Sequence, residues 1–141
     1  MNENPIITDD LKNLLNVEFG PEVYEIEKGL VKKFVQAIDD ANPLWQKTTP
    51  PTFPTALRLD ELHQKVRGAK CPLSRFLNGG SELEYYKAIN IGDVISVTGK
   101  LTNLRAREGK MGRMLFIITE LTYKNQMGEI VAKGRNTTIR Y

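Results

Sequence analysis

Three closely spaced runs in the second half of the chain decide the fold: DVISVTGKLTNLRAR (93–107), RMLFIITELTYK (113–124) and EIVAKGRNTTIR (129–140). Each run is rich in Val, Ile, Thr and Tyr, which favour β-strands. The connectors between them are short and contain glycine, so we predict antiparallel neighbours joined by tight turns. Both faces of Met114–Ile118 are apolar, which predicts a central strand covered on both sides, by a helix and by a candidate second subunit.

Two further strands are predicted upstream of these runs. Leu83–Ile89 is rich in β-formers and leads into Asn90–Asp93, a short connector with glycine. Glu22–Glu27 alternates apolar and acidic residues, which is typical of a short half-buried strand.

Helical patterns precede and separate the predicted strands. Thr8–Leu15 predicts a short helix with Thr8 as N-cap, and Leu30–Ile38 predicts an amphipathic helix. Ala41–Thr55 contains four prolines, so it must run as an extended loop before a weaker helix at Ala56–Val66. This order indicates an α+β fold, an antiparallel sheet of about five strands wrapped around one helix. Both longer helices are candidates for that position, and Leu30–Ile38 has the stronger apolar stripe.

Length and composition place the chain among globular proteins. It has 141 residues, 40% hydrophobic and 26% charged, so we predict one domain, 1–141, with residues 1–20 as an N-terminal extension. One cysteine and one histidine exclude a disulfide framework and a multi-ligand zinc site. We expect a cytoplasmic protein, since the polar, acidic N-terminus is no signal peptide and Met114–Ile118 is too short to span a membrane. A net charge of +3 without a basic–aromatic run makes nucleic acid an unexpected partner.

The stretch that carries chemistry is FVQAIDDANPLW (34–45), followed by PPTFP (50–54). Downstream, LNGGSELEYY (77–86) leads into IGDV (91–94). In order and spacing these segments resemble the MaoC-like dehydratases of the hot-dog superfamily, and most of all the FAS1-like, or N-terminal MaoC, dehydratase domain. The resemblance covers about residues 22–141 and implies a single hot-dog fold.

The resemblance implies an activity and a site. Active members hydrate trans-2-enoyl thioesters or dehydrate (R)-3-hydroxyacyl thioesters carried on coenzyme A or acyl carrier protein, with no other cofactor and no metal. Their Gly-Asp-x-Asn-Pro-[aliphatic]-His run supplies an Asp–His acid/base pair, while a backbone amide polarises the thioester carbonyl. Asp40, Asn42 and the two following residues match this run, but Trp45 holds the histidine position and Asp39 the glycine position.

The tryptophan removes half of the catalytic pair. An indole N–H donates a hydrogen bond but cannot accept a proton, so Trp45 cannot replace an imidazole. Loss of a positioned acid/base group typically costs roughly 10²–10⁴ in rate, so the chain alone is expected to be a poor dehydratase. Asp40 is then either a remnant of the catalytic pair or a residue that caps and turns the loop. His63, on the polar face of the weaker helix, is interpreted as a surface histidine rather than a substitute base.

Other candidate substrate-binding residues each have a structural alternative. Trp45 and Phe53 would line an acyl tunnel, or anchor their loop against the sheet. Asn78, Gly79 and Gly80 would let the backbone approach a thioester, or form a β-bulge. The hairpin at 105–113 would present Arg107, Lys110 and Arg113 to coenzyme A phosphates or an acidic carrier protein, or simply protect a sheet edge.

These residues predict a non-catalytic MaoC-like subunit that pairs with a catalytic hot-dog chain and binds the acyl group. One alternative is a homodimeric acyl-CoA-binding module without turnover. Another is a hot-dog thioesterase that uses Asp40 or Glu82 as its carboxylate.

Overall fold

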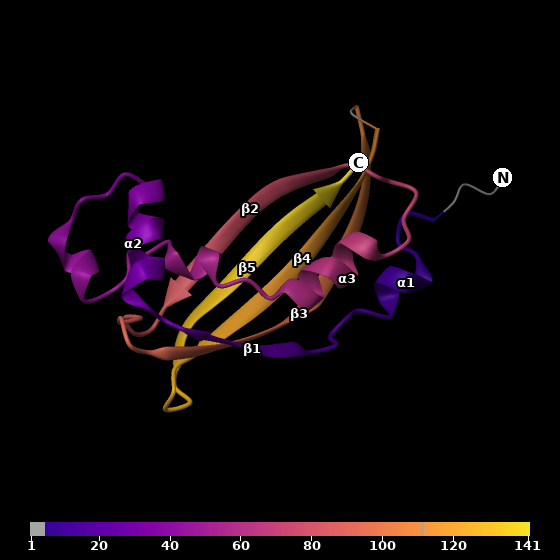
Figure 1. The fold of residues 1–141 in the computed structure, drawn as a ribbon. Coiled ribbons are helices and arrows are strands. Elements are labelled where there is room, and N and C mark those ends of the chain that lie inside the picture. The colour runs from indigo at the N-terminus through magenta and orange to yellow at the C-terminus, as the bar shows by residue number, and fades with distance from the viewer. Residues whose placement is uncertain (1–4, 111) are drawn as a thin grey trace.

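The computed structural model describes residues 5–110 and 112–141, and its centre is one five-stranded antiparallel sheet. The strands lie in the order β1-β3-β4-β5-β2 (Figure 1). Four of the five strands form where the sequence predicts them. Their bounds are β1 Phe19–Glu25, β2 Phe76–Tyr85, β3 Val94–Gly109, β4 Gly112–Lys124 and β5 Ile130–Arg140.

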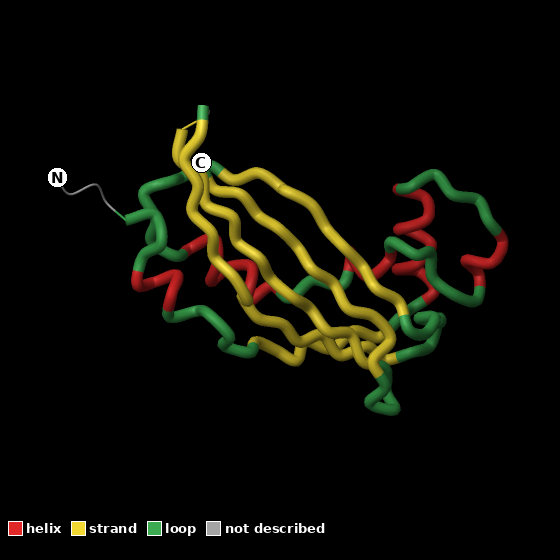
Figure 2. The backbone as a smooth tube through the Cα atoms, turned by 180° about the vertical axis from the view of Figure 1, so that it is seen from behind, coloured by secondary structure: helices red, strands yellow, loops and turns green. Residues whose placement is uncertain are grey.

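The helices lie on one side of this sheet or beyond its ends (Figure 1). Figure 2 views the opposite face, which no helix of the described residues crosses. The helical segments are α1 Asp9–Lys12, α2 Lys28–Ala37, α3 Asp60–Gly68 and two 3₁₀ turns, η1 Pro43–Gln46 and η2 Phe53–Ala56. Thr8 caps α1 as predicted, since its Oγ1 accepts a hydrogen bond of 3.3 Å from the Leu11 amide.

The helix that the sheet wraps around is α3, the candidate with the weaker apolar stripe. It contacts β1 and β3, and its Leu62 and Val66 are buried. α2 lies instead at one end of the sheet, where it packs on η1 and η2 (Figure 1). Leu30 of α2 and the C-cap residue Ile38 are accordingly 38% and 43% exposed. The strength of an apolar stripe measures amphipathicity and does not specify the partner: η1 and η2, rather than the sheet, pack on α2.

The core lies between α3 and the sheet. Leu115 and Ile117 of β4 are fully buried toward the helix, each worth about 1.5–3 kcal/mol of hydrophobic free energy. The alternate residues Met114, Phe116 and Ile118 point to the other face and are half-buried. The prediction of a helix on one side of this strand is therefore confirmed.

The prediction of a strand at Leu83–Ile89 is wrong in its bounds, because the strand begins and ends earlier in the chain. β2 begins at Phe76 and ends at Tyr85, with a register shift between Asn78 and Gly80. Gly80 has φ +147°, a conformation open chiefly to glycine, and the Gly79–Gly80 pair forms a bulge inside the strand. The low β-propensity of glycine would instead predict that the strand does not continue through this pair. Ile89 lies beyond the strand, where its carbonyl accepts hydrogen bonds from Thr48 and Thr49.

Gly99 of β3 lets the sheet and the segment before α3 pack closely. A Cβ added there would lie 2.8 Å from the Glu120 carbonyl oxygen and 3.1 Å from Leu59 Cδ2. We expect Gly99→Val to lower the free energy of unfolding by about 1–3 kcal/mol, because the core would be overpacked. Urea denaturation measures this. The control is Gly29→Ala in α2, whose added Cβ meets nothing within 4 Å, and it should be neutral or slightly stabilising. Equal effects would contradict the packing argument.

Candidate functional site

In the loop after α2, neighbouring residues donate hydrogen bonds to the carboxylate of Asp40. Trp45 Nε1 donates to Asp40 Oδ2 at 2.8 Å, and the Asn42 amide donates to Asp40 Oδ1 at 3.0 Å. The Asp40 amide in turn donates to the Val35 carbonyl at 3.0 Å, which fixes the loop to the end of α2. Both carboxylate oxygens therefore have a donor from the residues that surround them.

The spacing between Asp40, Asn42 and Trp45 has a local structural consequence. Asn42 caps η1, since its Oδ1 accepts a 3.0 Å hydrogen bond from the Leu44 amide, and Pro43 occupies the first position of that turn. The turn swings Trp45 back over Asp40. Asp39, at the family's glycine position, has φ +55° and so adopts the left-handed conformation that glycine favours. The backbone at Asp39 is therefore one that a glycine would also adopt, while the indole of Trp45 has no group that accepts a proton.

Trp45 also lines an apolar cavity of about 470 Å³ beside the loop. Tyr85 and Tyr86, at the end of β2, form another wall, and Pro50 and Pro54 contribute to the rest. Asp40 and Asn42 do not line this cavity. Phe53 does not line this cavity. It is fully buried and packs edge-on against Phe34, with ring centroids 5.3 Å apart. Phe53 is therefore an anchor of the loop in the core.

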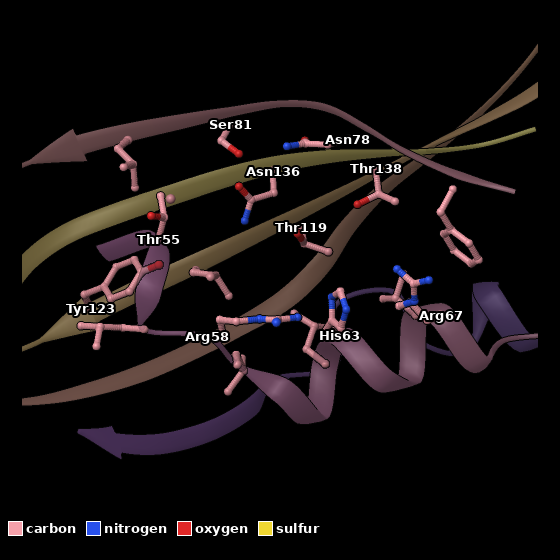
Figure 3. A pocket seen from close by; sticks show the side chains of 18 of the residues that line it. Thr55, Arg58, His63, Arg67, Asn78, Ser81, Thr119, Tyr123, Asn136 and Thr138 are labelled. Carbon is pink, nitrogen blue, oxygen red and sulfur yellow. The ribbon is translucent and has the colours of Figure 1, made fainter. Parts of the chain in front are cut away.

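A second cavity, of about 410 Å³, lies between α3 and the helix-facing side of the sheet. Asn78 is the predicted site residue that lines it, and the neighbouring Gly79 and Gly80 form the bulge of β2. Figure 3 shows that side chains missed by the sequence argument face it, among them Arg58 and Arg67. His63 is exposed, in agreement with its interpretation as a surface residue, and it also borders this cavity. His63 and Arg67 are four residues apart on one helix, and this spacing predicts that they share a face.

Two tyrosines fix the segment that leads into α3. Tyr24 donates to the Arg58 carbonyl, and Tyr123 donates to the Pro54 carbonyl at 3.2 Å. Burial raises the pKa of Tyr123 to about 12, and burial with the neighbouring Glu22 raises that of Tyr24 to about 12. Both hydroxyls therefore remain protonated donors at neutral pH.

Removal of the Tyr123 hydroxyl tests this arrangement. We expect Tyr123→Phe to lower stability by about 1–2 kcal/mol at neutral pH, since the Pro54 carbonyl loses its donor. Above the ordinary tyrosine pKa the unfolded chain releases the Tyr123 proton while the folded chain keeps it, so stability falls as pH rises toward 12. Urea denaturation at about pH 9 and about pH 11 should show a smaller loss in the variant than in the parent. An equal loss would contradict the assignment to Tyr123.

The basic hairpin does not reach the Asp40 loop within one chain. Arg107, Lys110 and Arg113 lie at the tip between β3 and β4, at the end of the sheet opposite α2 (Figure 1). β3 has 16 residues, so its two ends lie about 50 Å apart. Their predicted contact with coenzyme A phosphates or an acidic carrier protein therefore concerns the hairpin end of the sheet, away from the Asp40 loop of the same chain.

Residues 5–110 and 112–141 contain neither a candidate metal cluster nor a helix that could cross a membrane. No group of three or more His, Cys, Asp and Glu side chains in this part of the chain is placed to hold a metal ion. In the same residues no helix has the length and apolar character needed to cross a membrane.

The chain is similar to bacterial proteins described as UPF0336 proteins. It is 27% identical over 115 residues to one from Thermobifida fusca, covering 72% of this chain and 74% of the relative. It is 24% identical over 100 residues to one from Streptomyces avermitilis, covering 61% and 67%.

Several solved structures share its fold. The HadBC (3R-hydroxyacyl-ACP dehydratase) complex from Mycobacterium tuberculosis superposes with a TM-score of 0.74 at 15% identity, covering 89% of this chain and 96% of that one. The ChsH1-ChsH2 complex from the same organism gives 0.70 at 15% identity, covering 88% and 84%. A protein described as a MaoC-like dehydratase gives 0.79 at 16% identity, covering 92% of this chain and 42% of that one.

The sheet wrapped around α3 is the hot-dog fold that these MaoC-like neighbours share. The family model described as the FAS1-like, dehydratase domain region matches residues 13–134, and this chain therefore belongs to that family.

Proposed function

We propose that this chain is the non-catalytic, acyl-binding half of an (R)-specific enoyl-thioester hydratase, or 3-hydroxyacyl-thioester dehydratase. The observation that carries the proposal is the hydrogen bond from Trp45 Nε1 to Asp40 Oδ2 at 2.8 Å. Dehydration removes a proton from one carbon and hydroxide from the next, so it needs groups that exchange protons. An indole only donates a hydrogen bond, which leaves Asp40 without a catalytic partner in its own loop.

A hot-dog partner chain with an intact Asp-x-Asn-Pro-x-His run would supply the acid/base pair. The proposed contact is β2, an edge strand of ten residues, most of them exposed. An edge of this length presents unpaired N–H and C=O groups, which favours pairing with another strand. The HadBC and ChsH1-ChsH2 complexes among the structural neighbours support a pair of unlike chains.

Pairing through β2 would also give the basic hairpin a role. Antiparallel edge pairing reverses the direction of the partner's sheet, so the hairpin of this chain lies at the end where the partner's acid/base loop begins. Arg107, Lys110 and Arg113 are then proposed to attract the phosphates of coenzyme A or an acidic acyl carrier protein. The thioester carrier is the only cofactor that proton-transfer chemistry of this kind requires.

The test compares this chain, a candidate MaoC-like partner and the mixture of both in crotonyl-CoA hydration. We expect background activity from this chain alone, and activity from the mixture at least about ten times that of the partner alone. Brisk turnover by the isolated chain that survives Asp40→Asn would contradict the proposal. A partner that is fully active without this chain would also contradict it.

A second candidate is a homodimeric acyl-CoA-binding module without turnover. The apolar 470 Å³ cavity beside Trp45 favours it, because the cavity is formed within one chain. It predicts that acyl-CoA raises the melting temperature of the isolated chain with no partner present. Thioester hydrolysis has no comparable support: Glu82 is exposed and lines neither cavity, and both oxygens of Asp40 accept hydrogen bonds.

A further inference from the structure

The sheet side of the cavity under α3 is polar where a helix-covered sheet is normally apolar. Ser81, Asn136 and Thr119 lie in register across β2, β5 and β4, and form a row on the helix-facing side. Asn78 lies opposite Thr138 in the next row (Figure 3). The Oδ1 atom of Asn78 accepts from the Gly80 amide at 3.0 Å, which leaves its NH₂ group to donate into the cavity. Asn78 and Ser81 are exposed and the other three side chains are half-buried, so these polar groups are open to solvent and can also contact a ligand.

The helix side of the same cavity is cationic. Figure 3 shows Arg58, His63 and Arg67 rising from α3 and the residues just before it, below the strands. The guanidinium of Arg67 stacks on the Phe76 ring, 4.4 Å from its centroid, which holds it at the wall. No Asp or Glu lines this cavity among the described residues, so its charge is positive.

One carboxylate lies near these cations, and its effect is small. Asp60 Oδ1 is 3.8 Å from Arg58 Nε, but both side chains are more than half exposed. Such a surface ion pair contributes little and gives way readily to a better-placed anion. Within the described residues, no carboxylate lies at salt-bridge distance from Arg67.

The cavity also has an apolar wall. Leu59, Leu62 and Val66 on the helix segment are buried, and Leu83 and Leu121 face them from the sheet. An apolar wall opposite a cluster of guanidinium and amide donors matches a molecule with a hydrocarbon body and an oxyanion head. The volume of about 410 Å³ lies in the range of small-molecule sites.

We propose that the cavity between α3 and the sheet binds an organic anion, with its apolar body against Leu62 and Val66 and its oxyanion between Arg58, His63 and Arg67. The site belongs to this chain alone and does not include the Asp40–Trp45 loop. The inference therefore stands apart from the dehydratase pairing, and either can fail without the other.

Isothermal titration of the isolated chain tests it with three probes: octanoate, octyl phosphate and the uncharged octanamide. We expect saturable 1:1 binding of at least one anion, and binding of octanamide weaker by about tenfold or more, since charge-assisted hydrogen bonds are lost. Octanoate and octyl phosphate distinguish a carboxylate site from a phosphate site. No binding of either anion, or equal binding of octanamide, would overturn the proposal.

The variants separate the cavity from general surface charge. Arg67→Ala is expected to weaken anion binding by about tenfold or more, and Arg58→Ala likewise. Lys65→Ala is the matched control, because Lys65 is an exposed cation on the same helix that does not line the cavity. Circular dichroism checks that each variant is folded. Asn136→Leu, a substitution on the sheet side of the cavity, should also weaken anion binding. Equal losses in Lys65→Ala and Arg67→Ala would overturn the proposal.

The pH dependence of binding supplies a further readout. Burial, together with Arg58 and Arg67, lowers the pKa of His63, while Asp60 opposes the shift. The sheet side of the cavity presents only uncharged side chains. A bound anion would favour the imidazolium, so binding should take up a proton and tighten as pH falls from about 8 to about 6. His63→Gln should flatten this dependence, and an unchanged slope would contradict the place given to His63.

Discussion

Replacement of Trp45 by histidine is expected to raise crotonyl-CoA hydration by this chain about 10²-fold or more, because it restores the proton-exchanging half of the pair. The local backbone is compatible with this change: Asn42 caps η1, and Asp39 has a φ of +55°, a conformation that glycine also adopts. A histidine at position 45 would approach the carboxylate that Trp45 Nε1 now reaches at 2.8 Å. The rate should be measured for the chain alone and for its mixture with a partner.

Trp45→Phe is the matched control for this experiment. It removes the indole N–H without supplying a base, so it should remain at background while Asp40 Oδ2 loses its donor. The double variant Asp40→Asn with Trp45→His should lose the gain, since the pair needs its carboxylate. A histidine variant as inactive as the phenylalanine variant in both settings would show that more than the base is missing from this loop.

The fold followed from the sequence where local pattern and burial agree. β3, β4 and β5 alternate between helix-facing and outward side chains, and their glycine-containing turns determined the antiparallel order. The central helix did not follow, because its position depends on what lies opposite each apolar stripe. α2 has the stronger stripe but is covered by η1 and η2, whose packing no local pattern encodes.

The candidate site was predicted only where its residues are neighbours in the chain. Asp40 and Trp45 lie five positions apart, and the Asn-Pro turn between them brings their side chains together. The polar row from Ser81 to Asn136 to Thr119 depends on the register of three strands, which includes a bulge at Gly80. A shift of one residue would move each of these side chains to the opposite face, so their common cavity could not be read from the sequence.

In a complex with a catalytic partner, substitutions in the motif of each chain are expected to have very different effects on the rate. Replacement of the motif histidine of that partner by alanine should lower crotonyl-CoA hydration by roughly 10²–10⁴, the usual cost of a lost acid/base group. Asp40→Asn in this chain should change the rate by no more than about twofold, since both oxygens of Asp40 serve Trp45 and Asn42 within its own loop.

The expected loss differs between kcat and KM because this chain is proposed to bind and not to transfer protons. Substitution of the partner's histidine should lower kcat, whereas Arg107→Ala with Arg113→Ala in this chain should raise KM through weaker attraction of the carrier phosphates. The effect on KM should also shrink at high salt, as screening weakens attraction between exposed charges. If Asp40→Asn lowered kcat as far as loss of the partner's histidine, the carboxylate of this chain would be part of the catalytic machinery, and the proposed division between the subunits would be wrong.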